Sequence, residues 1–321
     1  MPLQFADRLN NVETSAIREL FKLLGKPGII SFAGGFPDSA MFDVDGIREA
    51  SNAALTQDPG AALQYGATEG FGPLREQLAH FMAQKGAKEV SADQLIVTTG
   101  SQQALDLIGK TMISPGDKVI VEGPTFLATI QCFRLYGAEL ISAPVDGHGV
   151  KTDELEKLIA ENKPKFVYLI PTFGNPSGAL LSAERRQQVL EMAVKHQTLI
   201  VEDDPYGDLY FGEAPPPSLL AMSASVPGSR ELLVHCGSLS KVLSPGLRVG
   251  WMIAPAELLA RATMCKQFSD AHTSTFAQAT AAQYLLAGRM PATLDKVRAV
   301  YAQRAQTMGD ALRRELGDAV E

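Results

Sequence analysis

Short, mostly apolar runs alternate along the chain with segments in which hydrophobic residues recur every three or four positions. The runs have the length and composition of buried strands. They lie at 95–98, 118–121, 166–170, 198–201, 232–235 and 249–253. Segments with helical periodicity lie between most of them, at 101–113, 126–136, 152–161 and 182–196. This alternation predicts an α/β fold in which helices cover both faces of a mostly parallel sheet.

Residues suited to ligand binding follow several of these runs. In parallel sheets, ligands bind beyond the carboxyl ends of the strands, so a site is expected in the loops that come next. The first loop contains Gly100, Ser101 and Gln102 at the start of a predicted helix, whose free backbone N–H groups could hold a phosphate. A serine N-cap after a tight turn explains these residues equally well. In the next loop, Phe126 could stack on a planar ring or belong to the core.

Two further loops contain an amide and a group of acids. Asn175 precedes Pro176, a pattern that also starts ordinary turns. The run at 198–201 is followed by three acids at 202–204 and then by Tyr206. An acid directly after a buried strand is often partly buried and then needs a cationic partner. A protonated ring nitrogen would be such a partner for Asp203.

A lysine among small and apolar residues follows the run at 232–235. Ser238 and Ser240 precede Lys241, and Arg248 comes seven residues after it. A lysine amine becomes nucleophilic only when burial or a neighbouring cation lowers its pKa. The segment is therefore typical of a lysine that forms a Schiff base, with Ser238 and Arg248 holding a phosphate. The Ser-x-x-Lys spacing also fits penicillin-binding serine hydrolases, but their companion motifs Ser-Asp-Asn and Lys-Thr-Gly do not occur in the sequence.

Composition and charge disfavour several classes of protein. The 321 residues have a net charge of -7, which offers no basic field for nucleic acid or an anionic membrane. Cys132, Cys236 and Cys265 lack the spacing of a disulfide framework or a zinc site, and no metal site is predicted. The first 20 residues have charges and no continuous apolar segment, and no apolar run reaches membrane-spanning length. A cytoplasmic protein is expected.

Together, these residues provide a partner for each part of pyridoxal phosphate. Lys241 would bind the aldehyde. Asp203 would keep the pyridine nitrogen protonated, which makes the ring a better acceptor for the electrons left at the substrate's α-carbon. The remaining partners are Tyr206 and Asn175 for the ring oxygen, Phe126 for the ring face and the turn at Gly100 for the phosphate.

The chain resembles the fold type I pyridoxal-phosphate-dependent aminotransferases of class I and II, and within them the 2-aminoadipate (LysN-type) branch. The segments that carry the resemblance are 15–19, 30–37, 63–66, the turn at Gly100, 175–178, 203–206 and 241–248. It implies an N-terminal segment at 1–44 that covers the substrate site as part of a small domain. It also implies a large cofactor-binding domain at 45–290 with a seven-stranded-type sheet, and a long helix within 291–321 that leads toward an incomplete small domain.

The resemblance also implies roles for individual residues. Lys241, which moves the proton between substrate carbons, is catalytic together with Asp203 and Tyr206. Tyr65 reaches the phosphate in the neighbouring subunit, which implies a homodimer. The implied cofactor-binding residues are Gly100, Ser101, Gln102, Phe126, Asn175, Asp203, Tyr206, Ser238, Ser240, Lys241, Arg248 and Tyr65. The implied substrate-binding residues are Gly34, Gly35, Asn175 and Arg18, although Arg18 also fits an ordinary surface arginine on an amphipathic helix.

The sequence departs from the family's pattern at its C-terminus. In this family the long helix is followed by a small domain with an arginine for the substrate α-carboxylate, whereas this sequence ends at Glu321. We therefore expect either a fragment or a naturally shortened protein. A cofactor-binding but catalytically impaired homologue is the alternative to an active aminotransferase. A DNA-binding regulator is not expected, because the family's pattern begins by Ser15. The amino donor stays open, with 2-aminoadipate and other acidic or hydrophobic amino acids favoured.

Overall fold

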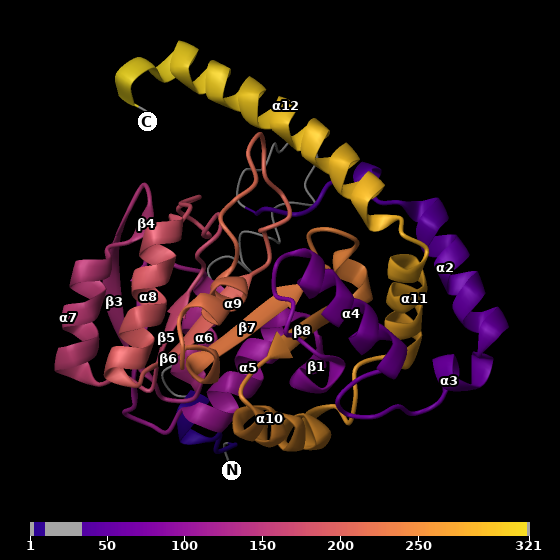
Figure 1. The fold of residues 1–321 in the computed structure, drawn as a ribbon, viewed down its shortest axis with the longest axis horizontal. Coiled ribbons are helices and arrows are strands. Elements are labelled where there is room, and N and C mark those ends of the chain that lie inside the picture. Colours follow the sequence, from indigo (N-terminus) through magenta and orange to yellow (C-terminus); the bar gives the residue numbers. More distant parts are fainter. Residues whose placement is uncertain (1–2, 10–33, 320–321) are drawn as a thin grey trace.

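An eight-stranded sheet forms the centre of the molecule in the computed structural model, which describes residues 3–9 and 34–319 (Figure 1). The strand order is β1-β8-β7-β6-β5-β2-β3-β4. The strands are β1 (Leu95–Thr99), β2 (Lys118–Gly123), β3 (Glu139–Asp146), β4 (Gly149–Val150), β5 (Phe166–Leu169), β6 (Leu199–Asp204), β7 (Leu233–Ser238) and β8 (Val249–Ile253).

Most strand pairs are parallel, which confirms the predicted α/β class. The parallel pairs are β2–β3, β2–β5, β5–β6 and β6–β7. Strand β8 is antiparallel to both β1 and β7, and β4 is antiparallel to β3 at the edge. The apolar runs did not predict β3 and β4. Strand β3 is mostly exposed or half-buried and contains Pro144, so it has no continuous apolar segment.

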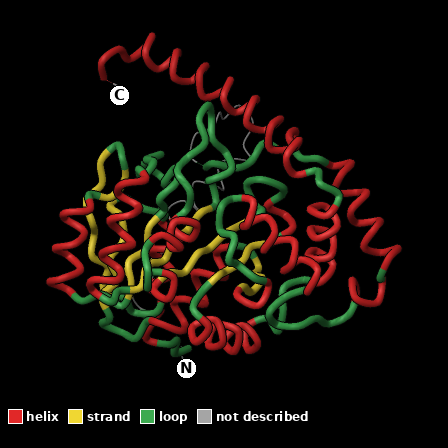
Figure 2. Tube along the Cα trace, in the orientation of Figure 1, coloured by secondary structure: helices red, strands yellow, loops and turns green. Residues whose placement is uncertain are grey.

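Helices cover both faces of this sheet (Figures 1 and 2). The helices on one face are α5 (Ser101–Met112), α6 (Leu127–Leu135) and α10 (Ala256–Ser269), which pack against Ile96, Val119, Phe166 and Met252. Those on the other face are α4 (Gly72–Gln84), α7 (Thr152–Asn162), α8 (Ala183–His196), α9 (Leu219–Met222) and α11 (Thr275–Leu286), which pack against Val97, Ile120, Val167 and Trp251. Consecutive strand residues thus belong to opposite cores, as the alternation of side chains along a strand requires.

The helical periodicity predicted its elements closely. Helices α5, α6, α7 and α8 each begin and end within one residue of the predicted bounds. The remaining α-helices are α2 (Val44–Gln57), α3 (Pro59–Leu63) and α12 (Met290–Leu316). Short 3-10 helices occupy Asp7–Leu9, Ser39–Met41, Ala92–Gln94, Ser223–Ser225, Arg230–Leu232, Pro245–Leu247 and Gly317–Ala319. None of the helices in the described ranges is both long and apolar enough to span a membrane.

Helix α12 begins in the core and then runs along the outside of the molecule (Figure 1). The Arg298 guanidinium lies 3.9 Å from the centre of the Tyr210 ring and donates to the carbonyl of Asp208 at 2.7 Å. One turn further on, the Tyr301 hydroxyl accepts a 2.9 Å hydrogen bond from the backbone N–H of Asp38. The helix therefore holds two segments, the loop after β6 and the segment that follows Gly34.

Candidate functional site

Five loops meet at one edge of the sheet. Strand β1 points the same way as β7 because both are antiparallel to β8, so the carboxyl ends of β1, β2, β5, β6 and β7 lie at the same edge. The residues predicted from sequence follow these strands. They are 100–102 after β1, Phe126 after β2, Asn175 after β5, Asp203 and Tyr206 at and beyond the end of β6, and 238–241 at and beyond the end of β7.

The three acids at the end of β6 have different surroundings. Glu202 and Asp204 lie on the face of the strand opposite to Asp203, as alternation requires. Glu202 lies 4.0 Å from Nη1 of Arg186, and Asp204 lies 3.6 Å from Nζ of Lys85. Within the described residues, Asp203 forms no salt bridge. Glu202 and Asp204 thus have cationic partners in the protein, as predicted for buried acids. Asp203 has none among the described residues.

The Asp203 carboxylate is buried, and within the described part of the chain only one of its oxygens has a protein partner. The Tyr168 hydroxyl donates to Oδ2 at 2.8 Å and itself accepts from Oγ1 of Thr129 at 3.1 Å. The other oxygen, Oδ1, is buried and has no hydrogen-bond partner among the described residues. Burial raises the pKa of Asp203 to about 6, although the Tyr168 hydrogen bond opposes this shift. Because such an atom is costly to leave unpaired, the site fits a ligand that brings a donor to Oδ1.

Lys241 lies between β7 and β8, close to two other predicted residues. Its Nζ donates to the carbonyl of Gly35 at 3.1 Å and lies 5.9 Å from the centre of the Tyr206 ring. The Tyr206 hydroxyl accepts a long hydrogen bond of 3.4 Å from Nδ2 of Asn175. Burial lowers the pKa of the Lys241 amine and raises the pKa of the Tyr206 hydroxyl. The structure therefore brings Lys241, Tyr206, Asn175 and Gly35 together, with the amine shifted toward its neutral, nucleophilic form.

An arginine stands beside the N-terminus of α5. Gly100 precedes this helix with a φ of 75°, and a Cβ added there would lie 2.4 Å from Nη2 of Arg248. The same Nη2 donates to the carbonyl of Thr99 at 3.2 Å. Glycine at position 100 thus permits both the left-handed turn and the approach of the guanidinium. A helix N-terminus with an adjacent arginine suits an anion such as phosphate.

Strand pairing places Ser238 close to this turn. It pairs with Gly250 on β8, where an added Cβ would lie 2.6 Å from the backbone nitrogen of Ser101. The Ser238 hydroxyl donates to Oγ of Ser240 at 2.9 Å and accepts from the Ser240 N–H at 3.1 Å. The predicted phosphate-side residues 101, 238, 240 and 248 therefore come from two loops that the sheet brings together.

The other predicted residues lie at the margin of this group or outside the described ranges. The Tyr65 side chain is 85% exposed, and its ring packs edge-on against His272 with 5.7 Å between ring centres. Phe126 is half-buried and packs against the core that α5 and α6 cover, so its stacking role stays a prediction. Gln102 is exposed in the first turn of α5, and Gly34 is exposed as well. Arg18 lies outside the described residues.

Two buried polar residues near the predicted site are not among those that the sequence predicts. The sequence predicts only a buried strand around Tyr168, yet the Tyr168 hydroxyl donates to Asp203. A tyrosine in an otherwise apolar strand is a usable signal, because a buried hydroxyl needs a partner. Nothing in the sequence marks Lys266, since a lysine in a helix is normally exposed, yet its side chain is fully buried.

Known proteins are similar to this chain in both sequence and fold. The family model described as aminotransferase class I and II matches residues 28–320. A 2-aminoadipate transaminase of Thermus thermophilus is 41% identical over 314 residues, which are 97% of this chain and 76% of the relative. An aromatic-amino-acid aminotransferase 1 of Thermococcus litoralis is 37% identical over 322 residues, or 99% of this chain and 76% of the relative.

A crystal structure shows the same relationship. The LysN alpha-aminoadipate aminotransferase of Thermus thermophilus, complexed with N-(5'-phosphopyridoxyl)-L-leucine, superposes with a TM-score of 0.88 at 39% identity. The match covers 97% of this chain and 77% of that one.

Proposed function

Because the chain belongs to the class I and II aminotransferase family, we propose that it moves the amino group of an acidic or hydrophobic L-amino acid, 2-aminoadipate among them, to a 2-oxo acid. It is a pyridoxal-phosphate-dependent aminotransferase of fold type I. The proposed range of donors is supported by relatives named for 2-aminoadipate and aromatic amino acids, and by a phosphopyridoxyl-leucine in the related crystal structure.

The main support for the proposed position of the cofactor is Oδ1 of Asp203. It is a buried acceptor at the carboxyl edge of the sheet, and the protein gives it no partner among the described residues. A protonated pyridine nitrogen would donate to it and provide the cation that this acid lacks. In the proposed site, the Asp203 carboxylate keeps the proton on that nitrogen, while Tyr168 holds the carboxylate in place through Oδ2.

When bound, pyridoxal phosphate supplies the electron sink for the bond that breaks at the substrate's α-carbon. In the proposed reaction, Lys241 binds the aldehyde of the cofactor through Nζ. With the substrate amine in its place, the neutral Nζ would take the proton from the substrate's α-carbon and, within the same half-reaction, deliver it to the carbon that keeps the amino group; the opposite half-reaction would reverse both transfers. The lowered pKa of Lys241 favours the neutral amine that both tasks need. Tyr206 and Asn175 orient the ring by hydrogen-bonding its oxygen, and Phe126 stacks on the ring face.

The phosphate would lie at the N-terminus of α5. Arg248 provides the positive charge, and the backbone N–H groups of Ser101 and Gln102 provide donors that the helix itself leaves free. The hydroxyls of Ser101, Ser238 and Ser240 and the side chain of Gln102 complete the proposed set. Tyr65 would serve the neighbouring subunit of a homodimer, which its exposed ring supports. Gly34, Gly35 and Arg18 would face the substrate.

Amino transfer from a panel of donors tests the proposed function. The purified protein is given pyridoxal phosphate, 2-oxoglutarate as acceptor, and L-2-aminoadipate, L-leucine, L-phenylalanine or L-lysine as donor. We expect turnover with the acidic and hydrophobic donors and little with lysine. A preference for lysine would overturn the proposed substrate class. Cofactor binding without turnover of any donor would instead favour the catalytically impaired homologue.

A further inference from the structure

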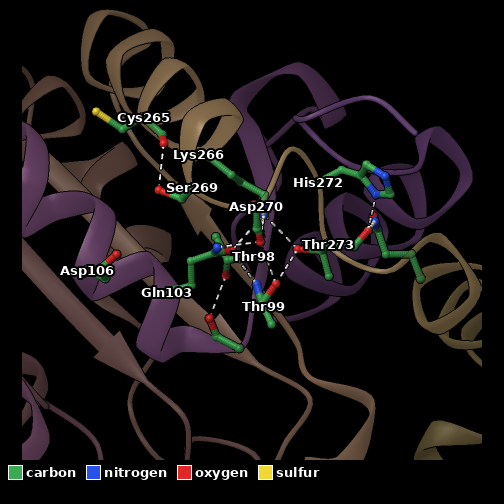
Figure 3. Close-up of polar contacts among 12 residues, drawn as sticks. Thr98, Thr99, Gln103, Asp106, Cys265, Lys266, Ser269, Asp270, His272 and Thr273 are labelled. Carbon is green, nitrogen blue, oxygen red and sulfur yellow. Dashed lines mark hydrogen bonds and ion pairs between the residues drawn. The ribbon is translucent and has the colours of Figure 1, made fainter. Parts of the chain in front are cut away.

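A fully buried lysine shares hydrogen-bond partners with Thr99, the residue that precedes the proposed phosphate-binding turn (Figure 3). Lys266, on α10, has a side chain that is 0% exposed. Its Nζ donates to Oε1 of Gln103 at 2.8 Å, to both carboxylate oxygens of Asp270 at 2.9 Å, and to Oγ1 of Thr273 at 3.0 Å. The buried amine is therefore fully hydrogen-bonded, and its charge is compensated by one carboxylate.

The same partners hold the residue that precedes the phosphate-binding turn. Oε1 of Gln103 accepts from the Thr99 N–H at 2.8 Å. Oδ2 of Asp270 accepts from Oγ1 of Thr99 at 3.1 Å and from Nε2 of Gln103 at 2.6 Å. Figure 3 shows these side chains converging on Thr99 from α5, α10 and the loop after α10. Thr99 is thus held by both its backbone N–H and its hydroxyl.

Thr99 in turn connects to both parts of the phosphate site. Its carbonyl accepts the 3.2 Å hydrogen bond from Nη2 of Arg248. It directly precedes Gly100, the residue at which the chain turns into α5. A displacement of Thr99 would therefore move the backbone N–H groups at 100–102 and release the guanidinium of Arg248.

Stability alone does not account for this arrangement. An apolar residue of similar size would fill the space of a buried, paired lysine without the desolvation that the charged pair requires. The pair is, however, well suited to hold Thr99 in one geometry, since hydrogen bonds to charged groups are stronger than neutral ones. Donors fixed before the anion arrives bind it more tightly than donors that must first be ordered.

We propose that Lys266 and Asp270 are positioning residues for the cofactor phosphate, which fix Thr99 and thereby the phosphate-binding turn and Arg248. The inference rests on the proposed phosphate-side roles of Ser101 and Arg248. Neither Lys266 nor Asp270 touches the phosphate in this account, and both act through Thr99 and Gln103.

Binding of two forms of the cofactor tests this proposal. Dissociation constants of the full-length protein, freed of cofactor, are measured by absorbance for pyridoxal phosphate and for pyridoxal, which has the same aldehyde and no phosphate. Lys266→Met should raise the constant for pyridoxal phosphate about tenfold or more, as expected for lost hydrogen bonds to a charged group. The constant for pyridoxal should change by less than about twofold, because Lys241 and Asp203 are untouched. Asp270→Asn, which keeps the side-chain shape, should behave in the same way.

Lys110→Met is the matched control. Lys110 also lies on α5 and contacts α10: its Nζ donates to Asp106 of its own helix at 2.7 Å and to Ser269 of α10 at 2.9 Å, and among the described residues it has no hydrogen bond to Thr99, Gln103 or Asp270. Replacing Lys110 should change neither constant by more than about twofold, since it breaks a partly exposed ion pair and a hydrogen bond to Ser269, neither of which involves Thr99.

The outcomes test the positioning role of Lys266 and Asp270 separately from the proposed aminotransferase function. Equal weakening of pyridoxal phosphate and pyridoxal in Lys266→Met or Asp270→Asn would mean a general structural role and would overturn the proposal. Unchanged binding of both compounds in these variants would overturn it as well. If Lys266→Met does not fold, Asp270→Asn decides. A wild-type protein that binds neither compound would contradict the proposed function itself.

Discussion

The hydroxyl of Tyr168 donates a 2.8 Å hydrogen bond to Oδ2 of Asp203, and the second oxygen of that buried carboxylate has no partner among the described residues. The protein therefore orients the carboxylate through one oxygen and leaves the other for a ligand. A carboxylate buried in this way destabilises the fold while it is ionised, and it becomes useful only when a cation joins it.

Replacing Asp203 with asparagine should stabilise the protein when no cofactor is bound. Burial raises the pKa of Asp203 to about 6, from the ordinary 3.8. The folded state thus carries a cost of burying charge that is complete above pH 6 and absent below about pH 4, where the carboxyl is protonated in both states. Asp203→Asn should raise the free energy of unfolding at pH 8 by about 2–3 kcal/mol. Urea unfolding at pH 8 and near pH 4 checks this, with no gain expected at the lower pH. An equal gain at both pH values would contradict it.

The same substitution should be strongly harmful to catalysis. With cofactor bound, the asparagine side chain of the Asp203→Asn variant cannot keep a proton on the pyridine nitrogen, so kcat should fall about 100-fold or more, as expected when one partner of a buried ion pair is removed. Tyr168→Phe should have a smaller effect of about tenfold, because it removes only the hydrogen bond to Oδ2. Steady-state kinetics with L-2-aminoadipate measure both. A larger loss in Tyr168→Phe than in Asp203→Asn would reverse the roles argued for the two residues.

Alanine substitutions at Gly100 and Gly116 can distinguish the effect of backbone strain from the effect of displacing Arg248 at the proposed phosphate site. Both have positive φ, 75° and 88°, but a Cβ would meet Arg248 at position 100 and nothing within 4 Å at position 116. Gly100→Ala and Gly116→Ala should each lower the free energy of unfolding by about 1–2 kcal/mol. Only Gly100→Ala should also weaken binding of pyridoxal phosphate, by about tenfold, because Arg248 must move away. Thermal unfolding and cofactor titration of the two variants provide the comparison, and equal affinities would count against the assigned role of Arg248.

Two neighbouring arginines on α8 should differ in their effect on stability. Arg186 is fully buried and donates to the carbonyls of Leu181 and Pro171 and to Thr172, whereas Arg185 pairs with Asp146 and is 24% exposed. Arg186→Met should cost about 3 kcal/mol, because it removes the buried guanidinium beside the Glu202 carboxylate and leaves the carbonyls of Leu181 and Pro171 without their donor. Arg185→Met should cost about 1 kcal/mol or less. Chemical denaturation of both variants measures the difference, and similar costs would show that Glu202 does not depend on Arg186.

Apolar runs and helical periodicity were enough to predict most of the fold. They failed at β3, where all positions but one are exposed or half-buried and Pro144 interrupts the run. They also say nothing about strand direction, and the antiparallel β8 follows from the short connection after β7. A parallel partner would need a longer crossover than the loop that contains Lys241.

The sequence predicts those site residues whose surroundings are unusual for their charge. An acid after a buried strand and a lysine without charged neighbours both stand out in the sequence, and the structure brings Asp203 and Lys241 to the same edge. The partners of Tyr168 and Lys266 could not be predicted from the sequence, because they belong to elements that are distant in the sequence. Thr129, for example, reaches Tyr168 from α6, and Gln103 reaches Lys266 from α5.

The covalent attachment of the cofactor tests the central claim most directly. Purified protein is incubated with pyridoxal phosphate, its visible absorption is recorded, and the adduct is reduced with borohydride and located by peptide mass spectrometry. Wild-type protein and the exposed-lysine control Lys157→Ala should both show the absorption band and a modified peptide that contains Lys241. Lys241→Ala should show neither. The same band and adduct in Lys241→Ala, or their absence from the wild type, would contradict the assignment of Lys241.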